Sequence, residues 1–189
     1  MKIGWYGILI FILFFQCEKS SNEKSKNDFV LYTIKAGEQY SDNNSIKILD
    51  TITEMKFVVK FDSSAIYSTI NPINQYDVNK LYGFSDNNTF HHINSARIGW
   101  CWLHNELQLY GYIYNDSIRT FQYITSIPIN AEISCSIKID GNAYLFRVQD
   151  TSIVMPRTST IAKGYQLFPY FGGDEVAPHD IRIWIKNIL

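Results

Sequence analysis

The sequence predicts an all-β protein, an antiparallel β-sandwich with a jelly-roll-like topology. From residue 29 onward, apolar and polar residues alternate with a period of two, and no helical periodicity is sustained. The alternating runs are short, and Gly, Asn and Asp residues that favour turns separate them. Many short strands of this kind are typical of sandwiches and jelly rolls. The 189 residues suffice for one such domain.

Residues 1–16 are expected to form an export signal that precedes the domain. Lys2 is followed by a nearly continuous apolar run over residues 3–15, which is shorter than the roughly 20 residues that a membrane-spanning helix requires. The run ends in Phe14-Phe15-Gln16-Cys17, which resembles the lipobox of bacterial lipoprotein signals. This resemblance implies cleavage before Cys17 and attachment of acyl chains such as palmitate to that cysteine.

Residues 17–28 are expected to be a lipidated polar tether, because no apolar residue stands between Cys17 and Phe29. Residues 29–189 then form a single domain. The predicted localisation is the bacterial cell envelope, where the N-terminal lipid anchors the chain to the outer membrane. The domain would face either the periplasm or the cell surface. Nucleic acid is not an expected partner, because 17 Lys and Arg against 18 Asp and Glu leave no net basic charge.

Alternation and turn residues place the strands in order. Residues 54–61 (EMKFVVKF) alternate, and His104-Asn105 then separates two alternating runs that form a hairpin. Asn115-Asp116-Ser117 is a turn that leads into a returning strand, whereas residues 64–80 look irregular or weakly helical around Pro72. Strands are therefore expected over residues 54–61, 95–103, 106–114, 118–125, 131–139, 142–149, 165–171 and 181–188.

Asp140-Gly141 gives the strongest hairpin signal, because this dipeptide between alternating runs is typical of a type I′ turn. Pairing Ile139 with Asn142 sets Ile137 opposite Tyr144 and Cys135 opposite Phe146, with all of these apolar side chains on one face. Cys135 is thus expected to be a small core residue. A disulfide with Cys101 is disfavoured, because Cys101 belongs to a different kind of face.

The hairpin over residues 95–114 has one core face and one mixed face. Its apolar face carries Ile98, Trp100, Trp102, Leu107, Leu109 and Ile113. Its other face carries Arg97, Gly99, Cys101, Gln108, Tyr110, Tyr112 and Tyr114, with Arg97 opposite Tyr112. Either loops cover this face and the tyrosines serve cross-strand packing, or the tyrosines stack on sugar rings while Arg97 binds a carboxylate or hydroxyls.

Two polar loops, residues 83–94 and 172–180, add His92, Asp174 and His179 as candidate ligand-binding residues. Zinc at His91, His92, Asp174 and His179 is disfavoured, because adjacent histidines on an extended chain point in opposite directions. Calcium bound by oxygens of Asp86, Asn87 and Asp174 is the better metal hypothesis, but the spacing matches no calcium loop. The sequence predicts no cofactor, and no nucleophile or phosphate-binding motif assigns a catalytic residue.

Three segments resemble a family of uncharacterised lipoproteins of the Bacteroidetes type. They are Asn79–Asp86 (NKLYGFSD), His91–Trp100 (HHINSARIGW) and Pro169–Ile181 (PYFGGDEVAPHDI). The resemblance spans nearly the whole domain, from about residue 32 to residue 185. It implies a lipid-anchored envelope protein and no particular activity, so no catalytic residue is transferred from it.

The sequence favours a lipid-anchored, non-catalytic β-sandwich that binds glycan or another envelope component. Its candidate ligand-binding residues are Arg97, Gln108, Tyr110, Tyr112, Tyr114, His92, Asp174 and His179. The alternative is a polysaccharide lyase or hydrolase on a jelly-roll scaffold. A lyase needs a His or Tyr base and an Arg or Asn to neutralise a uronate, and His92, Tyr112, Arg97 and His179 are residues of these types. A further alternative is a structural or protein-interaction lipoprotein, in which the tyrosine face contacts another protein.

Overall fold

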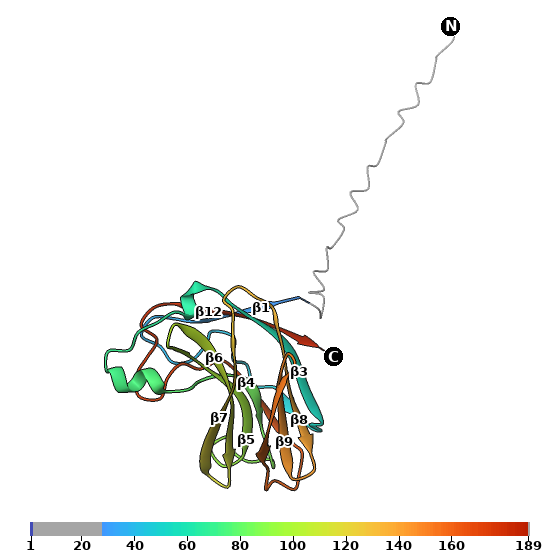
Figure 1. The fold of residues 1–189 in the computed structure, drawn as a ribbon. Helices are drawn as coiled ribbons and strands as arrows, with labels where there is room; N and C mark the ends of the chain where they lie inside the picture. The colour runs from blue at the N-terminus through green and yellow to red at the C-terminus, as the bar shows by residue number, and fades with distance from the viewer. Residues whose placement is uncertain (2–27, 189) are drawn as a thin grey trace.

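The computed structural model describes Met1 and residues 28–188, and these form two six-stranded antiparallel sheets packed face to face (Figure 1). The predicted antiparallel β-sandwich of jelly-roll type is confirmed. The predicted signal peptide, Cys17 and all but the last residue of the tether lie outside the described residues. Within the described part of the chain, no helix has the length and apolar character needed to cross a membrane.

Each sheet mixes strands from distant parts of the sequence. Sheet I runs in the order β1 (Val30–Ile34), β12 (Ile181–Ile188), β3 (Glu54–Phe61), β8 (Ile133–Asp140), β9 (Ala143–Val148) and β10 (Thr151–Pro156). Sheet II runs in the order β2 (Ile48–Leu49), β11 (Gly164–Leu167), β4 (Asn79–Ser85), β5 (Ser95–Leu103), β6 (Glu106–Asn115) and β7 (Ile118–Ile127). Two short 3₁₀ turns, η1 (Ser63–Ala65) and η2 (Pro72–Tyr76), lie between β3 and β4.

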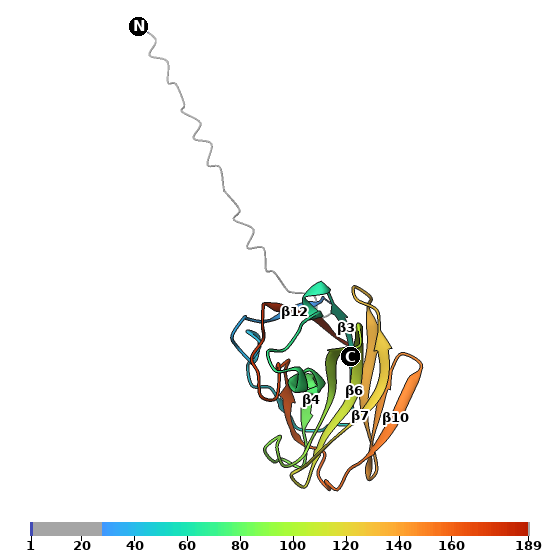
Figure 2. The same cartoon turned by 60° about the vertical axis from the view of Figure 1, so that its left-hand side comes forward.

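The core lies between the two sheets and contains the apolar faces that the alternation predicts. Trp100 from sheet II and Phe57, Phe61 and Phe146 from sheet I are almost completely buried there. The edge strands β7 and β10 contact each other on one side of the sandwich (Figure 2). Because its inner face is buried against sheet I, sheet II has only its outer face left for a ligand.

The β5–β6 hairpin forms as predicted. Leu103 pairs with Glu106 and Arg97 pairs with Tyr112. His104 and Asn105 both have positive φ, 54° and 61°, as a type I′ turn requires. This register puts the side chains of Arg97 and Tyr112 next to each other on the outer face of sheet II.

The predicted register of the β8–β9 hairpin is wrong by two residues. Asp140 pairs with Ala143, so Ile137 lies opposite Phe146 and Cys135 opposite Val148. Only Gly141 in this turn has positive φ (60°), which fits a type II′ turn with glycine first rather than type I′. A shift of two keeps every side chain on its predicted face, and Cys135 is a buried free thiol.

Strand β4 is the main element that the sequence analysis missed. The residues around Pro72 do form 3₁₀ turns, but the chain is already extended from Asn79 onward. All seven residues of β4 are buried: sheet I covers one face, and on the other face Lys80 lies under the β11–β12 loop, where its Nζ bonds to the Gly172 carbonyl oxygen. A strand covered on both faces lacks the alternation that reveals a half-exposed one. Strands β1, β2 and β10 were also not predicted.

A buried ion pair links the two sheets below the core. Asp86, directly after β4, accepts hydrogen bonds from Arg157 Nε and from the Tyr144 hydroxyl, each at 2.6 Å. Arg157 Nη2 adds a second bond to the same carboxylate at 3.2 Å. Asp86 and Arg157 are 0% and 7% exposed. Each charge is therefore matched inside the fold.

Candidate functional site

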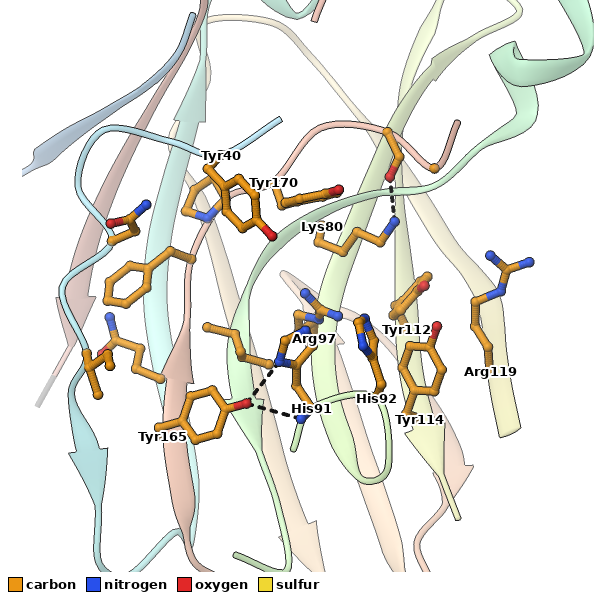
Figure 3. Close-up of a pocket in the computed structure, with 18 of the residues that line it drawn as sticks. Tyr40, Lys80, His91, His92, Arg97, Tyr112, Tyr114, Arg119, Tyr165 and Tyr170 are labelled. Carbon is orange, nitrogen blue, oxygen red and sulfur yellow. Dashed lines mark hydrogen bonds between the residues drawn. The ribbon is translucent and has the colours of Figure 1, made fainter. Parts of the chain in front are cut away.

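A cavity of about 640 Å³ opens on the outer face of sheet II (Figure 3). Its size is typical of sites for small molecules or sugar units. Strands β4, β5, β6 and β7 provide its floor, and its walls come from the β1–β2 loop, the β4–β5 turn, β11 and the β11–β12 loop. The side chains that give it its chemical character are Lys80, His91, His92, Arg97, Tyr112, Tyr114, Arg119, Tyr165, Tyr170 and Asp174.

Arg97 stands at the centre of the floor and is 5% exposed. Its guanidinium carbon lies 5.4 Å from the ring centroid of Tyr112, while its Nε has no hydrogen-bond partner among the described residues. Gly83 pairs with Arg97, and a side chain at Gly83 would place its Cβ 2.8 Å from Arg97 Cγ. A buried donor without an acceptor is costly, and only tyrosines, with no carboxylate among them, counter the effect of burial on Arg97.

Lys80 is the second buried cation, and it lies beside Arg97. Its Nζ donates a 2.6 Å hydrogen bond to the carbonyl oxygen of Gly172 and lies 5.3 Å and 5.5 Å from the ring centroids of Tyr112 and Tyr170. Burial, together with the charges of Arg97 and Arg119, lowers the pKa of Lys80 to about 8. Lys80 therefore keeps its charge at neutral pH but loses it under mildly alkaline conditions.

His91 and His92 lie side by side at the mouth of the cavity, with ring centroids 4.2 Å apart. They stand in a turn, so the expectation that adjacent histidines point apart is wrong. Burial, Arg97 and His92 lower the pKa of His91 to about 4, and burial with the charges of Arg97 and Lys80 also lowers the pKa of His92. Both imidazoles are therefore uncharged at neutral pH.

Tyr165 on β11 fixes the orientation of His91. The backbone N–H of His91 donates to the Tyr165 hydroxyl oxygen at 3.1 Å, and His91 Nδ1 lies 2.9 Å from the same oxygen. Because the ring is neutral, the Tyr165 O–H can donate to Nδ1, which leaves the proton of His91 on Nε2.

Tyr112, Tyr114 and Arg119 complete the floor toward β7. The Tyr114 ring centroid lies 5.3 Å from that of His92, and Arg119 pairs with Tyr114 across the β6–β7 register. Burial and Tyr114 raise the pKa of Tyr112 to about 12, so that phenol stays protonated at neutral pH. Tyr114 is thus the tyrosine whose ring packs against the His92 imidazole.

The charge of the cavity is strongly one-sided. Lys80, Arg97 and Arg119 line it, whereas Asp174 is the only carboxylate among its described lining residues. Clefts with one sign of charge and low-dielectric walls attract ligands of the opposite sign. The site is therefore suited to an anionic ligand, with tyrosines available to contact apolar sugar faces.

The structure places five of the eight predicted ligand-binding residues around this cavity and three elsewhere. Arg97, His92, Tyr112, Tyr114 and Asp174 line it. Gln108 and Tyr110 lie farther along the sheet and bond to each other, with the Tyr110 hydroxyl donating to Gln108 Oε1. His179 lies beside η1, where its Nε2 is 2.8 Å from the carbonyl oxygen of Ser64.

Four residues of the cavity were not predicted from the sequence: Lys80, Arg119, Tyr165 and Tyr170. The predicted three-residue turn Asn115-Asp116-Ser117 would set Arg119 opposite Ile113, on the core face. In the structure Asn115 pairs with Ile118, so Arg119 lies opposite Tyr114 instead. Lys80 was hidden with β4. Tyr170 reaches the site from the β11–β12 loop, a placement that no local pattern encodes.

Neither metal hypothesis gains support from the side-chain geometry. Asp86, the leading calcium candidate, is occupied by Arg157 and Tyr144, and Asn87 Oδ1 accepts the backbone N–H groups of Thr160 and Ile161. Within residues 28–188, no cluster of three His, Cys, Asp or Glu residues could hold a metal ion. His179 is not among the residues that line the cavity with His91 and His92, and its Nε2 bonds to the Ser64 carbonyl oxygen.

No protein-family model matches this sequence, and no curated protein sequence matches it either. Solved structures share its fold. A laminarinase catalytic domain from Thermotoga maritima aligns with a TM-score of 0.55 at 10% identity, over 84% of this chain and 75% of its own. A GH16 protein for mixed-linkage glucan from Bacteroides ovatus gives 0.55 at 10% identity, over 86% and 81%. An alginate lyase gives 0.58 at 6% identity, over 83% and 72%.

These neighbours define the class of fold, the jelly-roll β-sandwich that glucanases and a polysaccharide lyase use. They contradict the expectation that the domain is a non-catalytic binding module, because the neighbours are enzymes that act on polysaccharides. The lyase-or-hydrolase alternative is the better supported of the two. The comparisons do not bear on the resemblance to uncharacterised lipoproteins, which stays a prediction.

Proposed function

We propose that this protein is a polysaccharide lyase that cleaves a polymer of uronic acids in the cavity of sheet II. The observation that carries the proposal is Arg97, a buried cation with no carboxylate beside it among the described residues, in a cavity with three cationic side chains and one carboxylate. A uronate carboxylate supplies the counterion that Arg97 lacks. The fold shared with an alginate lyase is consistent with this substrate class.

The lining residues favour elimination over hydrolysis. Most glycoside hydrolases need two carboxyl groups on either side of the bond that they cleave, and Asp174 stands alone among the described lining residues. A lyase needs instead a cation for the sugar carboxylate, a base for the adjacent proton and an acid for the leaving oxygen. Arg97, His92 and Tyr114 are residues of these three types around one cavity.

In the proposed reaction, Arg97 and Lys80 bind the uronate carboxylate and so make the proton on the neighbouring carbon C5 more acidic. His92 removes that proton, which its neutral imidazole can do because its pKa is held below the usual value. The electron pair left on C5 forms the C4=C5 double bond as the C4–O bond breaks. The Tyr114 hydroxyl then gives its proton to the leaving oxygen.

The test is incubation of the protein with polymers of galacturonate, glucuronate, mannuronate and guluronate. The C4=C5 double bond is conjugated to the carboxylate, so we expect ultraviolet absorbance to rise with at least one polymer. His92→Ala should lower the rate by at least about 100-fold, as loss of a general base does. His104→Asn, in the exposed β5–β6 turn, is the matched histidine control and should keep the rate. No absorbance change with any polymer would overturn the proposal.

We also keep the proposal that Cys17 carries the lipid anchor, which would hold the domain near envelope or extracellular polysaccharides. It rests on the sequence alone. Cells that express the chain and receive labelled palmitate should incorporate the label into the wild type and not into Cys17→Ala. Label in both chains would argue against lipidation at this position.

A further inference from the structure

Beyond the cavity, the outer face of sheet II continues as a row of aromatic side chains that the proposed reaction does not use. In the β6–β7 register, Arg119 pairs with Tyr114, Phe121 with Tyr112 and Tyr123 with Tyr110. Partners in a sheet point to the same face. Arg119, Phe121 and Tyr123 therefore follow one another along β7, starting at the rim of the cavity.

Burial differs sharply between the two strands. Tyr112 and Tyr110 on β6 are 2% and 9% exposed, whereas Phe121 and Tyr123 are 45% and 48% exposed. The accessible aromatic surface is thus one strand away from the tyrosines that the sequence analysis singled out. Those tyrosines lie beside it on the same face of the sheet.

The exposed rings pack against the neighbouring tyrosines of β6. Phe121 lies nearly parallel to Tyr112, with 8° between the planes and 6.4 Å between the centroids, and it meets Tyr110 edge to face at 6.1 Å. Tyr123 meets Tyr110 edge to face at 5.8 Å, and its hydroxyl lies 3.1 Å from Ser126 Oγ. A ring packed in this way loses little conformational freedom when a ligand stacks on it.

We propose that Arg119, Phe121 and Tyr123 form a second sugar-binding subsite, which holds an acidic polysaccharide chain where it leaves the cavity over β7. This inference rests on the proposed function for the identity of its ligand. Arg119 lines the cavity and offers a cation for the carboxylate of the next uronate unit, while the two rings offer apolar faces for stacking. The chain would continue past the cleavage site, so the protein would cut within polymers rather than only at their ends.

The test is affinity electrophoresis of Phe121→Ala/Tyr123→Ala and wild type. Native gels are cast with or without each uronate polymer, and the slowing of the protein by the polymer gives its dissociation constant. We expect the dissociation constant for the polymer to rise about tenfold, the size that the loss of two stacking contacts predicts. Arg119→Ser leaves both rings in place and should also weaken binding. It tests the subsite independently if the double variant does not fold. Thr120→Ala/Gln122→Ala, exposed on the opposite face of β7, is the matched control and should bind as wild type does.

A second readout uses cleavage. The double variant should lose rate on polymer but keep the wild-type rate on a uronate trimer, and its early products from polymer should be shorter. If the wild type binds polymer but never cleaves it, the lyase proposal fails, and the binding comparison still decides the subsite. Equal binding by wild type, the double variant and Arg119→Ser would overturn the subsite, as would wild-type binding to no acidic polymer. The subsite would also be overturned if the wild type forms dimers that the double variant does not, while both bind polymer equally. The rings would then serve self-association.

Discussion

Arg97 and Arg157 are both nearly buried, at 5% and 7% exposure, but their surroundings are opposite. Arg157 bonds to Asp86 within a cluster that Tyr144 completes. Burial lowers the pKa of Arg157, but the hydrogen bond and charge of Asp86 outweigh it and leave that pKa raised. Burial lowers the pKa of Arg97, and only tyrosines oppose that shift. One charge is neutralised inside the fold, and the other is left for an outside anion.

This contrast separates a residue that stabilises the fold from one that the fold keeps ready for a ligand. A buried pair that is already satisfied has nothing to offer a substrate. A buried cation without an acceptor weakens the fold until a carboxylate arrives, and binding then relieves that cost. Variants at the two arginines should therefore have opposite effects on stability and on activity.

The largest expected effect is on stability, at the satisfied pair. Asp86→Asn keeps the shape of the side chain but leaves the charge of Arg157 buried without a counterion. We expect the free energy of unfolding to fall by about 3–5 kcal/mol, as when one partner of a buried pair is removed. Urea denaturation followed by tryptophan fluorescence measures it.

The double variant Asp86→Leu/Arg157→Met is the control for that effect. It removes both charges, so it should cost clearly less than Asp86→Asn alone. If the single variant were as stable as wild type, the pair would not link the two sheets in the way proposed.

The next effect is on activity, at the unpaired arginine. Arg97→Met keeps much of the side-chain volume but removes the charge that would neutralise the substrate carboxylate. We expect the lyase rate to fall by at least about 100-fold, the usual size for loss of one preorganised charge contact. The free energy of unfolding should stay within about 1 kcal/mol of wild type or rise, because an unsatisfied donor is removed.

Arg147→Met is the matched control, because Arg147 is an exposed arginine on β9 of the other sheet. It should change neither quantity. Strong destabilisation by Arg97→Met, with the rate per folded molecule unchanged, would make Arg97 a structural residue and remove the contrast with Arg157.

The two arginines also show what a single sequence can reveal. Arg97 sits in a hairpin whose turn, His104-Asn105, fixes the register locally, so its place opposite Tyr112 could be predicted. The pairing of Arg157 with Asp86 joins residues 71 positions apart, and no local pattern encodes it. Asp86 accordingly looked like a free calcium ligand in the sequence.

The same division between local and distant contacts holds for the fold and the rest of the site. Alternation predicted the sandwich and most of its strands, since one face of each strand meets the core. It failed for β4, which is covered on both faces, and it left the β8–β9 register two residues off, because Asp140-Gly141 permits more than one turn. Lys80 and Tyr170 come together only through the bridge between β4 and the β11–β12 loop.

The smallest expected effect concerns pH and the other cavity cation, Lys80. The charged and aromatic groups around it are Arg97, Arg119, Asp77, Tyr112 and Tyr170. Its pKa of about 8 lies at a pH where enzyme rates can be measured. As pH rises through 8, Lys80 loses the charge that would help bind the uronate. We expect kcat/KM to fall toward a tenfold loss per pH unit above 8, provided the charge is required. Lys80→Arg keeps its charge and should remove this decline.

Stability should move the other way over the same pH range. The pKa of Lys80 is lowered in the fold from 10.5 to about 8, so between these values the unfolded chain binds the extra proton. The contribution of Lys80 to the free energy of unfolding then rises with pH by up to about 1.4 kcal/mol per unit. Denaturation of wild type and Lys80→Met at pH 7.5, 8.5 and 9.5 isolates this contribution. The activity should therefore fall while this part of the stability rises, and a kcat/KM that stays level from pH 7.5 to 9.5 would show that the reaction does not need the charge of Lys80.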